Sequence, residues 1–377
     1  MPGSPPPPKR ASLPTPASAA PKAGFEAPTV DDPNLINLLD YERVAAGRLP
    51  RGALAYYTGG AMDERTLQDN LAAFRKRRIL PRVMTDVTTI DTSVDVLGRR
   101  WAWPTWICPT AFHRMAHPDG ELATARAAAA RGITMALSTI SSTDLAEVAA
   151  VGGPRWFQVY LLADAGARRE LIQRAVDHGF EALVLTVDLQ RLGRRERDIR
   201  VGFTLPEGVS IPHIAWATGQ PLEEAAGVSL AETLSWADLE WLAEFGLPVI
   251  VKGVLHPDDA RLAIEHGAAG VVVSNHGGRQ LDGAIASLDA LPAVVDAVGG
   301  RVPVLMDGGV RRGTDALIAL ALGATAVGIG RPVIWGLAVD GEAGVGRVLD
   351  LLAAELEQSM ALAGVASLAA LTPELIV

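Results

Sequence analysis

Cysteine is nearly absent from this chain, because Cys108 is the single cysteine among 377 residues. One thiol can form neither an internal disulfide nor a cysteine-based zinc site, so neither feature can stabilise the fold. We predict no metal site. A chain without disulfides suits a reducing compartment, and we expect the protein in the cytoplasm.

Long hydrophobic runs and an excess of basic charge are also missing. No apolar stretch approaches the roughly 20 residues that cross a bilayer, so we expect no membrane segment. The formal net charge is −9, which argues against a general nucleic-acid-binding protein, because such proteins present a basic face. The acidic balance does not exclude an anionic small-molecule substrate, since the local placement of arginines decides that.

The first 28 residues are rich in Pro, Ala and Ser and lack the apolar region of a signal peptide. Such a segment buries too little apolar surface to offset its chain entropy, and we expect residues 1–28 to be a disordered tail. The whole chain is 49% hydrophobic and 20% charged, which is typical of a globular protein. Residues 29–377 are predicted to form one domain.

Short apolar runs alternate with amphipathic, alanine-rich segments along most of the chain. The runs are nearly continuous in hydrophobicity, which is typical of strands buried on both faces. Several of the segments between them begin at Asp, Ser or Thr and end at Gly, as capped helices do. Eight strand–helix units without a GxGxxG after the first strand predict a (β/α)8 TIM barrel rather than a doubly wound sheet. The predicted strands are 106–111, 134–139, 156–161, 182–188, 248–253, 270–275, 303–309 and 326–332.

Two segments do not fit the repeating unit. The connection from residue 188 to 248 is too long for an ordinary loop, so we expect part of it to be the fourth helix and the rest a lid after strand 4. Residues 33–75 have the pattern of helices and precede the barrel. They are predicted to form an N-terminal helical cap over one barrel end.

Polar residues or glycines end all eight predicted strands. Because a TIM barrel carries its chemistry at the carboxyl ends of its strands, these side chains are predicted to face one mouth. Glycines and arginines follow strands 7 and 8, where backbone N–H groups, a helix N-terminus and guanidinium groups bind phosphate. The phosphate would belong to a substrate or a cofactor. The strand-end residues are Thr110, Ser138, Gln158, Tyr160, Thr186, Asp188, Lys252, Ser274, His276, Asp307, Gly330 and Arg331.

His276 and Arg279 follow strand 6. A histidine accepts a proton near neutral pH, and an arginine presents a planar fork to a carboxylate. Asp188, at the end of strand 4, would hold the imidazole in one tautomer. Lys252 ends an apolar strand, so its buried charge requires a negative partner.

The segments that carry these residues resemble the FMN-dependent 2-hydroxy-acid oxidase and dehydrogenase family, which includes glycolate oxidase, lactate oxidase and mandelate dehydrogenase. The resemblance extends from about residue 39 to residue 371. It rests on SNHGGRQLD at 274–282, PVLMDGGVRRGTDALIALALGA at 303–324, GIGRP at 328–332, FQVY at 157–160, LPVIVKGV at 247–254, and on TVD with RLGRRERD within 186–198.

The resemblance implies FMN as the cofactor and oxidation of an (S)-2-hydroxy acid to the 2-oxo acid. It implies that His276 is the catalytic base and that Asp188 orients it. Arg195 and Arg279 are similar to the pair that binds the substrate carboxylate, and Tyr56 and Tyr160 to the tyrosines that bind substrate. The residues implied to bind FMN are Thr110, Ala111, Ser138, Gln158, Thr186, Lys252, Ser274, Asp307, Gly309, Arg311, Gly330 and Arg331.

Several alternatives stay open at this point. Ala111 is of the kind found in oxidases, which favours O2 as the acceptor and H2O2 as the product, whereas a dehydrogenase would use a quinone or another acceptor. A flavin-dependent isomerase and a non-catalytic flavin-binding protein are the remaining alternatives. Ile140 stands where glycolate-type members carry Trp, which implies a substrate larger than glycolate. The family suggests a homotetramer.

Overall fold

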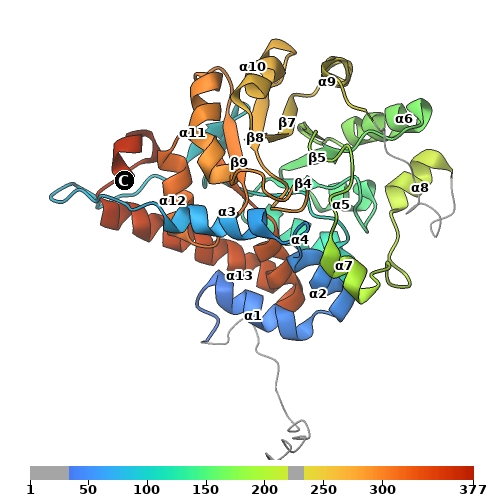
Figure 1. Cartoon of the computed structure of the whole chain (residues 1–377), viewed down its shortest axis with the longest axis horizontal. Helices are drawn as coiled ribbons and strands as arrows, with labels where there is room; N and C mark the ends of the chain where they lie inside the picture. Colours follow the sequence, from blue (N-terminus) through green and yellow to red (C-terminus); the bar gives the residue numbers. More distant parts are fainter. Residues whose placement is uncertain (1–33, 220–232) are drawn as a thin grey trace, which may run out of the picture.

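The structure is a computed structural model that describes residues 34–219 and 233–377. The predicted tail at residues 1–28 and part of the predicted lid lie outside the described residues. Within them, eight parallel strands close into a barrel in the order β10-β3-β4-β5-β6-β7-β8-β9 (Figure 1). This confirms the predicted (β/α)8 TIM barrel, and each barrel strand overlaps one predicted run. The strands are β3 (Thr105–Ile107), β4 (Met135–Leu137), β5 (Arg155–Val159), β6 (Leu183–Thr186), β7 (Val249–Val254), β8 (Gly270–Val273), β9 (Val304–Asp307) and β10 (Ala326–Ile329).

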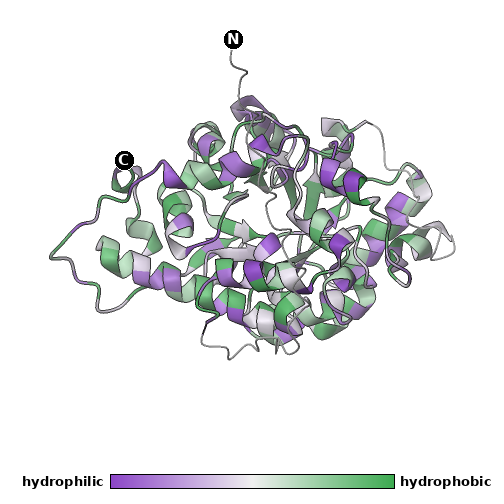
Figure 2. Ribbon diagram, turned by 60° about the horizontal axis from the view of Figure 1, so that its bottom comes forward, coloured by the Kyte–Doolittle hydropathy of each residue, from purple (hydrophilic) through white to green (hydrophobic). Residues whose placement is uncertain are grey.

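Helices surround the barrel, and at least one follows each strand. They carry both hydrophilic and hydrophobic residues (Figure 2), as expected of helices that bury one face. Among the described residues, none of them has the length and apolarity needed to cross a membrane. The helices are α4 (Gly120–Ala129), α5 (Leu145–Val151), α6 (Ala165–Asp177), α7 (Glu196–Val201), α8 (Pro212–Thr218), α9 (Trp236–Ala243), α10 (Pro257–Glu265), α11 (Ser287–Val298), α12 (Gly313–Ala321) and α13 (Arg331–Ala363).

Side chains along each barrel strand alternate between the helical layer and the barrel interior. In β7, Val249 and Val251 belong to the core beneath the helices, whereas Ile250 belongs to a separate core inside the barrel. The next inward position after Ile250 is Lys252, which is buried. The interior of the barrel is therefore apolar toward the amino ends of the strands and polar at their carboxyl ends.

A two-stranded antiparallel hairpin closes the amino end of the barrel. It consists of β1 (Val94–Val96) and β2 (Arg99–Trp101). Trp101 packs against Trp156, which lies near the start of β5, with ring centroids 5.5 Å apart. The open end of the barrel is therefore the carboxyl end, where the polar side chains lie.

Three helices precede the barrel, as predicted for the N-terminal cap. They are α1 (Leu38–Arg48), α2 (Arg51–Thr58) and α3 (Arg65–Arg75). Helix α1 packs against α13, and α3 packs against α11. The end of α2 reaches the carboxyl ends of the barrel strands, because Tyr56 and Tyr57 line the same cavity as residues from those strand ends. The cap thus contributes to the mouth of the barrel.

Candidate active site

The carboxyl ends of the strands surround a cavity that is open to solvent. Most of the predicted site residues line it, although they come from segments spread over almost the whole chain. The structure brings together Tyr56, Thr110, Ala111, Ser138, Tyr160, Arg195, Lys252, His276, Arg279, Asp307, Gly309, Arg311, Gly330 and Arg331.

Four predicted residues lie behind the cavity wall rather than in it. Asp188 bonds His276, and Ser274 accepts a hydrogen bond from Lys252 at 3.0 Å. Gln158 accepts a hydrogen bond from the Ser138 hydroxyl at 3.1 Å and donates one to Thr186 at 3.1 Å. These side chains orient the residues that face the cavity.

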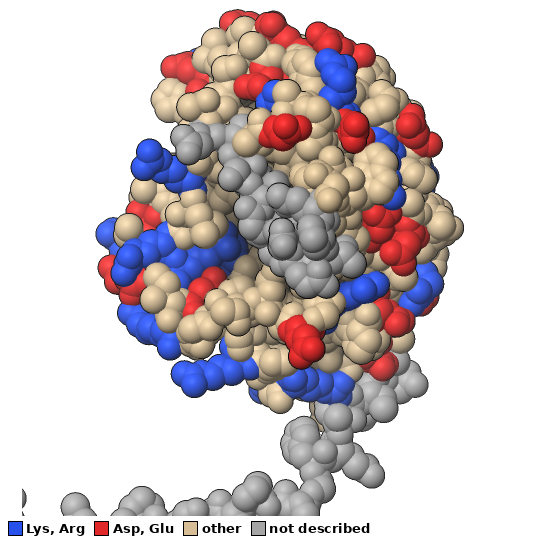
Figure 3. Space-filling view, turned by 90° about the vertical axis from the view of Figure 1, so that its right-hand side faces the viewer, with Lys and Arg blue, Asp and Glu red and all other residues tan. Residues whose placement is uncertain are grey.

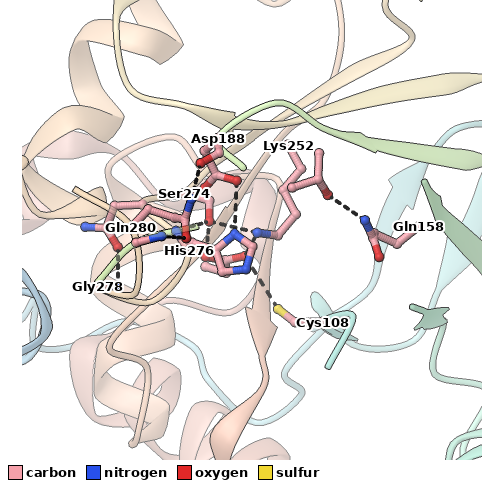
Figure 4. Close-up of polar contacts among 12 residues, drawn as sticks. Cys108, Gln158, Asp188, Lys252, Ser274, His276, Gly278 and Gln280 are labelled. Carbon is pink, nitrogen blue, oxygen red and sulfur yellow. Dashed lines mark hydrogen bonds and ion pairs between the residues drawn. The ribbon is translucent and has the colours of Figure 1, made fainter. Parts of the chain in front are cut away.

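His276 and Asp188 form the central pair of the site (Figure 4). The His276 Nδ1 and Asp188 Oδ1 atoms are 3.0 Å apart. Burial lowers the pKa of His276, although the charge of Asp188 opposes that shift. Burial disfavours the charged form of Asp188 as well, yet His276 and Lys252 outweigh it and keep the Asp188 pKa below its ordinary value. The pair therefore holds a neutral imidazole beside a carboxylate at neutral pH.

Lys252 belongs to a second buried network at the base of the cavity. Its Nζ lies 3.3 Å from a carboxylate oxygen of Asp307, and the Ser274 hydroxyl donates to that carboxylate at 2.6 Å. Burial disfavours the ammonium ion, but the charges of Asp307 and Asp188 raise the Lys252 pKa above its ordinary value. The predicted negative partner of Lys252 is thus Asp307, and the lysine is charged.

Four arginines, Arg195, Arg279, Arg311 and Arg331, give the cavity an excess of positive charge. Among the described residues, none of them forms an ion pair with a carboxylate. Burial and the neighbouring Arg195 lower the pKa of Arg279 to about 10, and burial with Arg279 and Arg311 lowers that of Arg331 to about 9. Lys and Arg also gather on one part of the molecular face that carries α8 (Figure 3). Half-buried cations without a carboxylate partner among the described residues favour anionic ligands in this cavity.

Two of these arginines also bond the cap. Arg331 donates to the carbonyl oxygens of Tyr57 at 2.8 Å and Gly59 at 3.0 Å, at the C-terminus of α2, and to Gly277 O at 3.1 Å. Arg279 donates to Gly59 O at 2.9 Å and to Tyr56 O. Cations at this helix end match its dipole and satisfy its free carbonyl groups.

The residues around the cavity fit FMN. Gly330 precedes the first turn of α13, so the positive end of the helix dipole and the Arg331 guanidinium favour a phosphate there. Gly309 has a φ of +89°, and a Cβ atom on it would lie 2.3 Å from the carbonyl oxygen of Asn70, so only glycine fits. Lys252 supplies a second cation from the barrel floor. This donor set suits a cofactor with a phosphate at one end and a polar ring system at the other.

Sequence reasoning missed several residues that line the cavity. They include Tyr57, Cys108, Leu189 and Leu192. Cys108 could have been found, because it lies two positions after the inward-facing Trp106. The two leucines lie in the segment after β6, whose path no strand periodicity predicts.

Other side chains outside the predicted site support it. The Gln280 amide donates to Asp188 O at 2.7 Å and to Arg191 O at 2.8 Å, so it joins the loop after β8 to the segment after β6 (Figure 4). Ile140 lines the cavity as expected. Trp216 of α8 does not line the cavity, and the Arg174 guanidinium lies over its ring, 4.3 Å from the centroid.

Comparisons with known proteins bear on this arrangement. The sequence model of a family described as FMN-dependent dehydrogenase matches residues 45–377. An L-lactate oxidase from Nostoc sp. is 50% identical over 348 residues, which cover 88% of this chain and 95% of that protein. A glycolate oxidase from Spinacia oleracea is 47% identical over 344 residues, covering 89% and 93%.

Solved structures agree with these relatives. The crystal structure of a mandelate oxidase with benzoyl-formic acid superposes with a TM-score of 0.83 at 44% identity, covering 89% of this chain and 96% of that one. A mandelate oxidase variant with (S)-mandelic acid gives a TM-score of 0.84 at 44% identity, with the same coverage. The matches confirm the resemblance that the sequence motifs indicated.

Proposed function

Because the chain belongs to the FMN-dependent dehydrogenase family and oxidises 2-hydroxy acids with FMN, we propose that His276 is its catalytic base. The observation that carries the assignment is the 3.0 Å contact between Asp188 and Nδ1 of His276, which lines the same cavity as Arg195 and Arg279. When FMN is bound, it accepts the two electrons that the hydroxy acid loses. Every other part of the reaction falls to the protein's own side chains.

His276 would take a proton from the substrate. Its Nδ1–H donates to Asp188, which leaves Nε2 free as the acceptor. The lowered pKa keeps the imidazole neutral before the reaction. The carboxylate of Asp188 then stabilises the imidazolium that forms, and it holds the ring in one tautomer throughout.

Arg195 and Arg279 would bind the substrate carboxylate. Neither has a carboxylate partner among the described residues, and Arg279 is already held by backbone carbonyls, so it is preorganised for a ligand. The Tyr56 ring packs under the Arg279 guanidinium at 4.8 Å. Burial and the charge of Asp188 raise the pKa of Tyr160, so its hydroxyl stays protonated and can donate to the substrate.

The predicted FMN-binding residues would hold different parts of the cofactor. Arg311, Arg331 and the glycines at 309 and 330 would hold the phosphate end. Lys252 and Ser138 would hold the ring system and Asp307 the ribityl chain, with Gln158, Thr186 and Ser274 supporting them from behind. Thr110 and Ala111, from the loop after β3, complete the wall.

Ile140, Leu189 and Leu192 are apolar residues among those that line the cavity. We infer that the substrate carries an aliphatic or aromatic side chain, larger than that of glycolate, because apolar surface in a pocket favours apolar groups. The acids named for the relatives, L-lactate and (S)-mandelate, fit this class. Ile140→Trp should then lower activity with (S)-mandelate at least tenfold more than activity with glycolate.

The decisive experiment is a spectrum of the yellow holoenzyme under anaerobic conditions during titration with glycolate, L-lactate and (S)-mandelate. The proposal expects bleaching, fastest with one of the larger acids, and loss of bleaching in His276→Ala. If no 2-hydroxy acid bleaches the wild-type protein, the assignment of His276 fails, and a flavin-dependent isomerase becomes the better hypothesis.

We propose O2 as the electron acceptor, with H2O2 as the product. The oxidase names of the relatives and the presence of Ala111 at the cavity support it. Admitting air to the bleached enzyme should restore the yellow colour within the turnover time and release one H2O2 per acid oxidised. Restoration only by a quinone would identify a dehydrogenase instead.

We further propose a cytoplasmic homotetramer. Cys108 is a buried free thiol, which suits a reducing compartment. Val83 and Met84 are 81% and 101% exposed on the segment that follows α3, and exposed apolar side chains of this kind favour contact with another copy. Native mass measurement of the wild type and of Val83→Glu tests the assembly, and cell fractionation tests the compartment.

A further inference from the structure

A buried pair of asparagines joins the cap to the loop that carries His276. The side-chain nitrogen of Asn70, on α3, donates to Asn275 Oδ1 at 2.8 Å, and the side-chain nitrogen of Asn275 donates to Asn70 Oδ1 at 2.8 Å. The two residues are 2% and 5% exposed. Asn275 directly precedes His276 in the chain, so the cap reaches the neighbour of the base across 205 sequence positions.

The amide pair also bonds the backbone on both sides of the loop. Asn275 Oδ1 accepts from the Gly278 N–H at 3.0 Å, and the Asn275 amide donates to Ile285 O at 3.0 Å. Asn70 Oδ1 accepts from the Ser287 N–H at 3.1 Å. Every side-chain polar atom of the pair is therefore in use, and the loop from 275 to 287 is closed on itself (Figure 4 shows His276 and Gly278 in it).

His276 needs such support, because its backbone is in the left-handed region, with a φ of 58°. For a residue with a Cβ atom this conformation is unfavourable. A conformation of this kind persists only where the surroundings over-determine it. The hydrogen bond from the His276 N–H to Ser274 Oγ at 3.1 Å fixes one side of the residue, and the bonds around Asn275 fix the other.

Asn70 of α3 also lies against the loop after β9, which contains Gly308 and Gly309. The backbone oxygen of Asn70 would lie 2.3 Å from a Cβ on Gly309, and its side-chain nitrogen 3.4 Å from a Cβ on Gly308. One residue of the cap thus abuts the loop of the base and the loop that would hold FMN. Asn70 itself does not line the cavity.

We propose that Asn70 is a positioning residue for the reaction: through Asn275 it holds His276 at the angle and depth from which the imidazole takes the substrate proton. The inference rests on the proposed role of His276. It adds that the N-terminal cap is part of the catalytic apparatus, although no cap residue other than the two tyrosines of α2 reaches the cavity among the described residues.

The test compares Asn70→Ala with Asn37→Ala, both prepared as holoenzyme. Asn37 is a matched control because it lies in the same cap, where its side chain accepts hydrogen bonds from the first turn of α1, far from His276 in the chain. The measurement is anaerobic bleaching of bound FMN by the acid that bleaches the wild type fastest. Asn70→Ala should lower the saturating rate at least tenfold and change the half-saturating concentration less than threefold.

The pH profile supplies a second readout that a merely structural role would not move. Asp188 raises the pKa of His276, whereas burial, Lys252 and Arg195 lower it, and Asn70 contacts none of those groups. Loosening the loop reduces the burial of the imidazole, so the acid limb of the rate profile should move up toward the ordinary histidine range, about pH 6.5. Asn37→Ala should keep the wild-type limb.

Amide hydrogen exchange of the peptide around 274–282 separates this inference from the proposed function. Asn70→Ala should speed exchange there at least tenfold, even if no 2-hydroxy acid bleaches the wild type. If Asn70→Ala does not fold, Asn70→Asp provides the same test, since it keeps the shape and the acceptors but loses the donor to Asn275. The proposal would be overturned if both Asn70 variants kept the wild-type bleaching rate, the wild-type acid limb of the pH profile and the wild-type amide hydrogen exchange at 274–282.

Discussion

At the scale of single residues, buried charges dominate the site. Lys252 and Asp307 lie 3.3 Å apart with side chains that are 5% and 8% exposed. Removing one member of a buried ion pair leaves the other without compensation, which costs far more than the pair contributes as a whole. The Ser274 hydroxyl and the Cys108 thiol complete the surroundings of Asp307.

A double-mutant cycle on this pair follows from that argument. Lys252→Met and Asp307→Asn should each lower the free energy of unfolding by about 3–5 kcal/mol, because each leaves a buried charge or buried polar groups without a partner. The double variant should lose less than the sum of the two. Urea denaturation of the FMN-free protein measures all three, and strictly additive losses would show that the two groups do not interact.

The pair of His276 and Asp188 leads to a pH prediction. Asp188 raises the pKa of His276, so Asp188→Asn should lower that pKa further and move the acid limb of kcat/KM to lower pH. The amide cannot stabilise an imidazolium, so kcat should fall by about 10²–10⁴-fold. Asp177→Asn, on the exposed end of α6, is the control and should match the wild type. An acid limb that moved to higher pH would contradict the assignment of the base.

The polar residues of the strand ends could be predicted because strand side chains alternate. Lys252 lies two positions after Ile250, and Ser274 two after Val272, so both face inward with an apolar residue below them. The same rule does not separate residues that line the cavity from those that support it. Gln158 and Ser274 are predicted to bind FMN, yet neither lines the cavity, and both bond neighbouring side chains that do line it.

At the scale of elements, the contact between α3 and the loop after β8 determines the shape of the mouth. Gly278 has a φ of +75°, and a Cβ on it would lie 2.5 Å from the backbone nitrogen of Leu67. The loop and the helix therefore touch through backbone atoms, without a side chain between them. A contact this close transmits any displacement of α3 to the neighbours of His276.

Two glycine variants in this loop separate the contact from backbone strain. Gly278→Ala and Gly283→Ala both place a side chain at positive φ, but a Cβ on Gly283 meets nothing within 4 Å. Gly283→Ala should cost roughly 1–2 kcal/mol of stability and keep its activity. Gly278→Ala should cost more and lower the bleaching rate at least tenfold. Equal activity in the two variants, measured alongside thermal unfolding, would show that the contact between Gly278 and α3 does not affect catalysis.

The helices and strands themselves follow from sequence patterns, but the contact of α3 with the loop does not. Asn70 lies on a helix whose apolar positions predict only that one face is buried. No local rule says that its amide meets Asn275, because that meeting depends on how the cap packs on α11 and α13. The sequence therefore predicted the position of the cap but not its contact with the loop that carries His276.

At the scale of the whole molecule, an acidic protein encloses a cationic cavity. The net charge is −9, while Arg195, Arg279, Arg311 and Arg331 surround the space that fits the cofactor. Folding brings these like charges together at an electrostatic cost. A bound anion offsets that cost, so ligand binding and stability are coupled.

Thermal unfolding with FMN and with riboflavin tests this coupling. At a ligand concentration of 100 Kd, FMN should stabilise the apoprotein by about 2.7 kcal/mol. Riboflavin lacks the phosphate, so at the same concentration it should give less than half of the shift in Tm, as followed by circular dichroism. Arg311→Leu should remove most of the difference between the two ligands. Equal shifts with both flavins in the wild type would show that the arginines do not serve a phosphate.

The bonds of Arg331 to the end of α2 set an order of events during synthesis. Those bonds span 272 and 274 positions, and a ribosome adds about 5–20 residues per second. The end of helix α2 is therefore synthesised about 14–55 s before the arginine that caps it. Through that interval the nascent chain carries the tyrosines of its mouth without the groups that anchor them. A chain terminated between residues 329 and 331 would contain all eight barrel strands and still lack the arginine that bonds the end of α2.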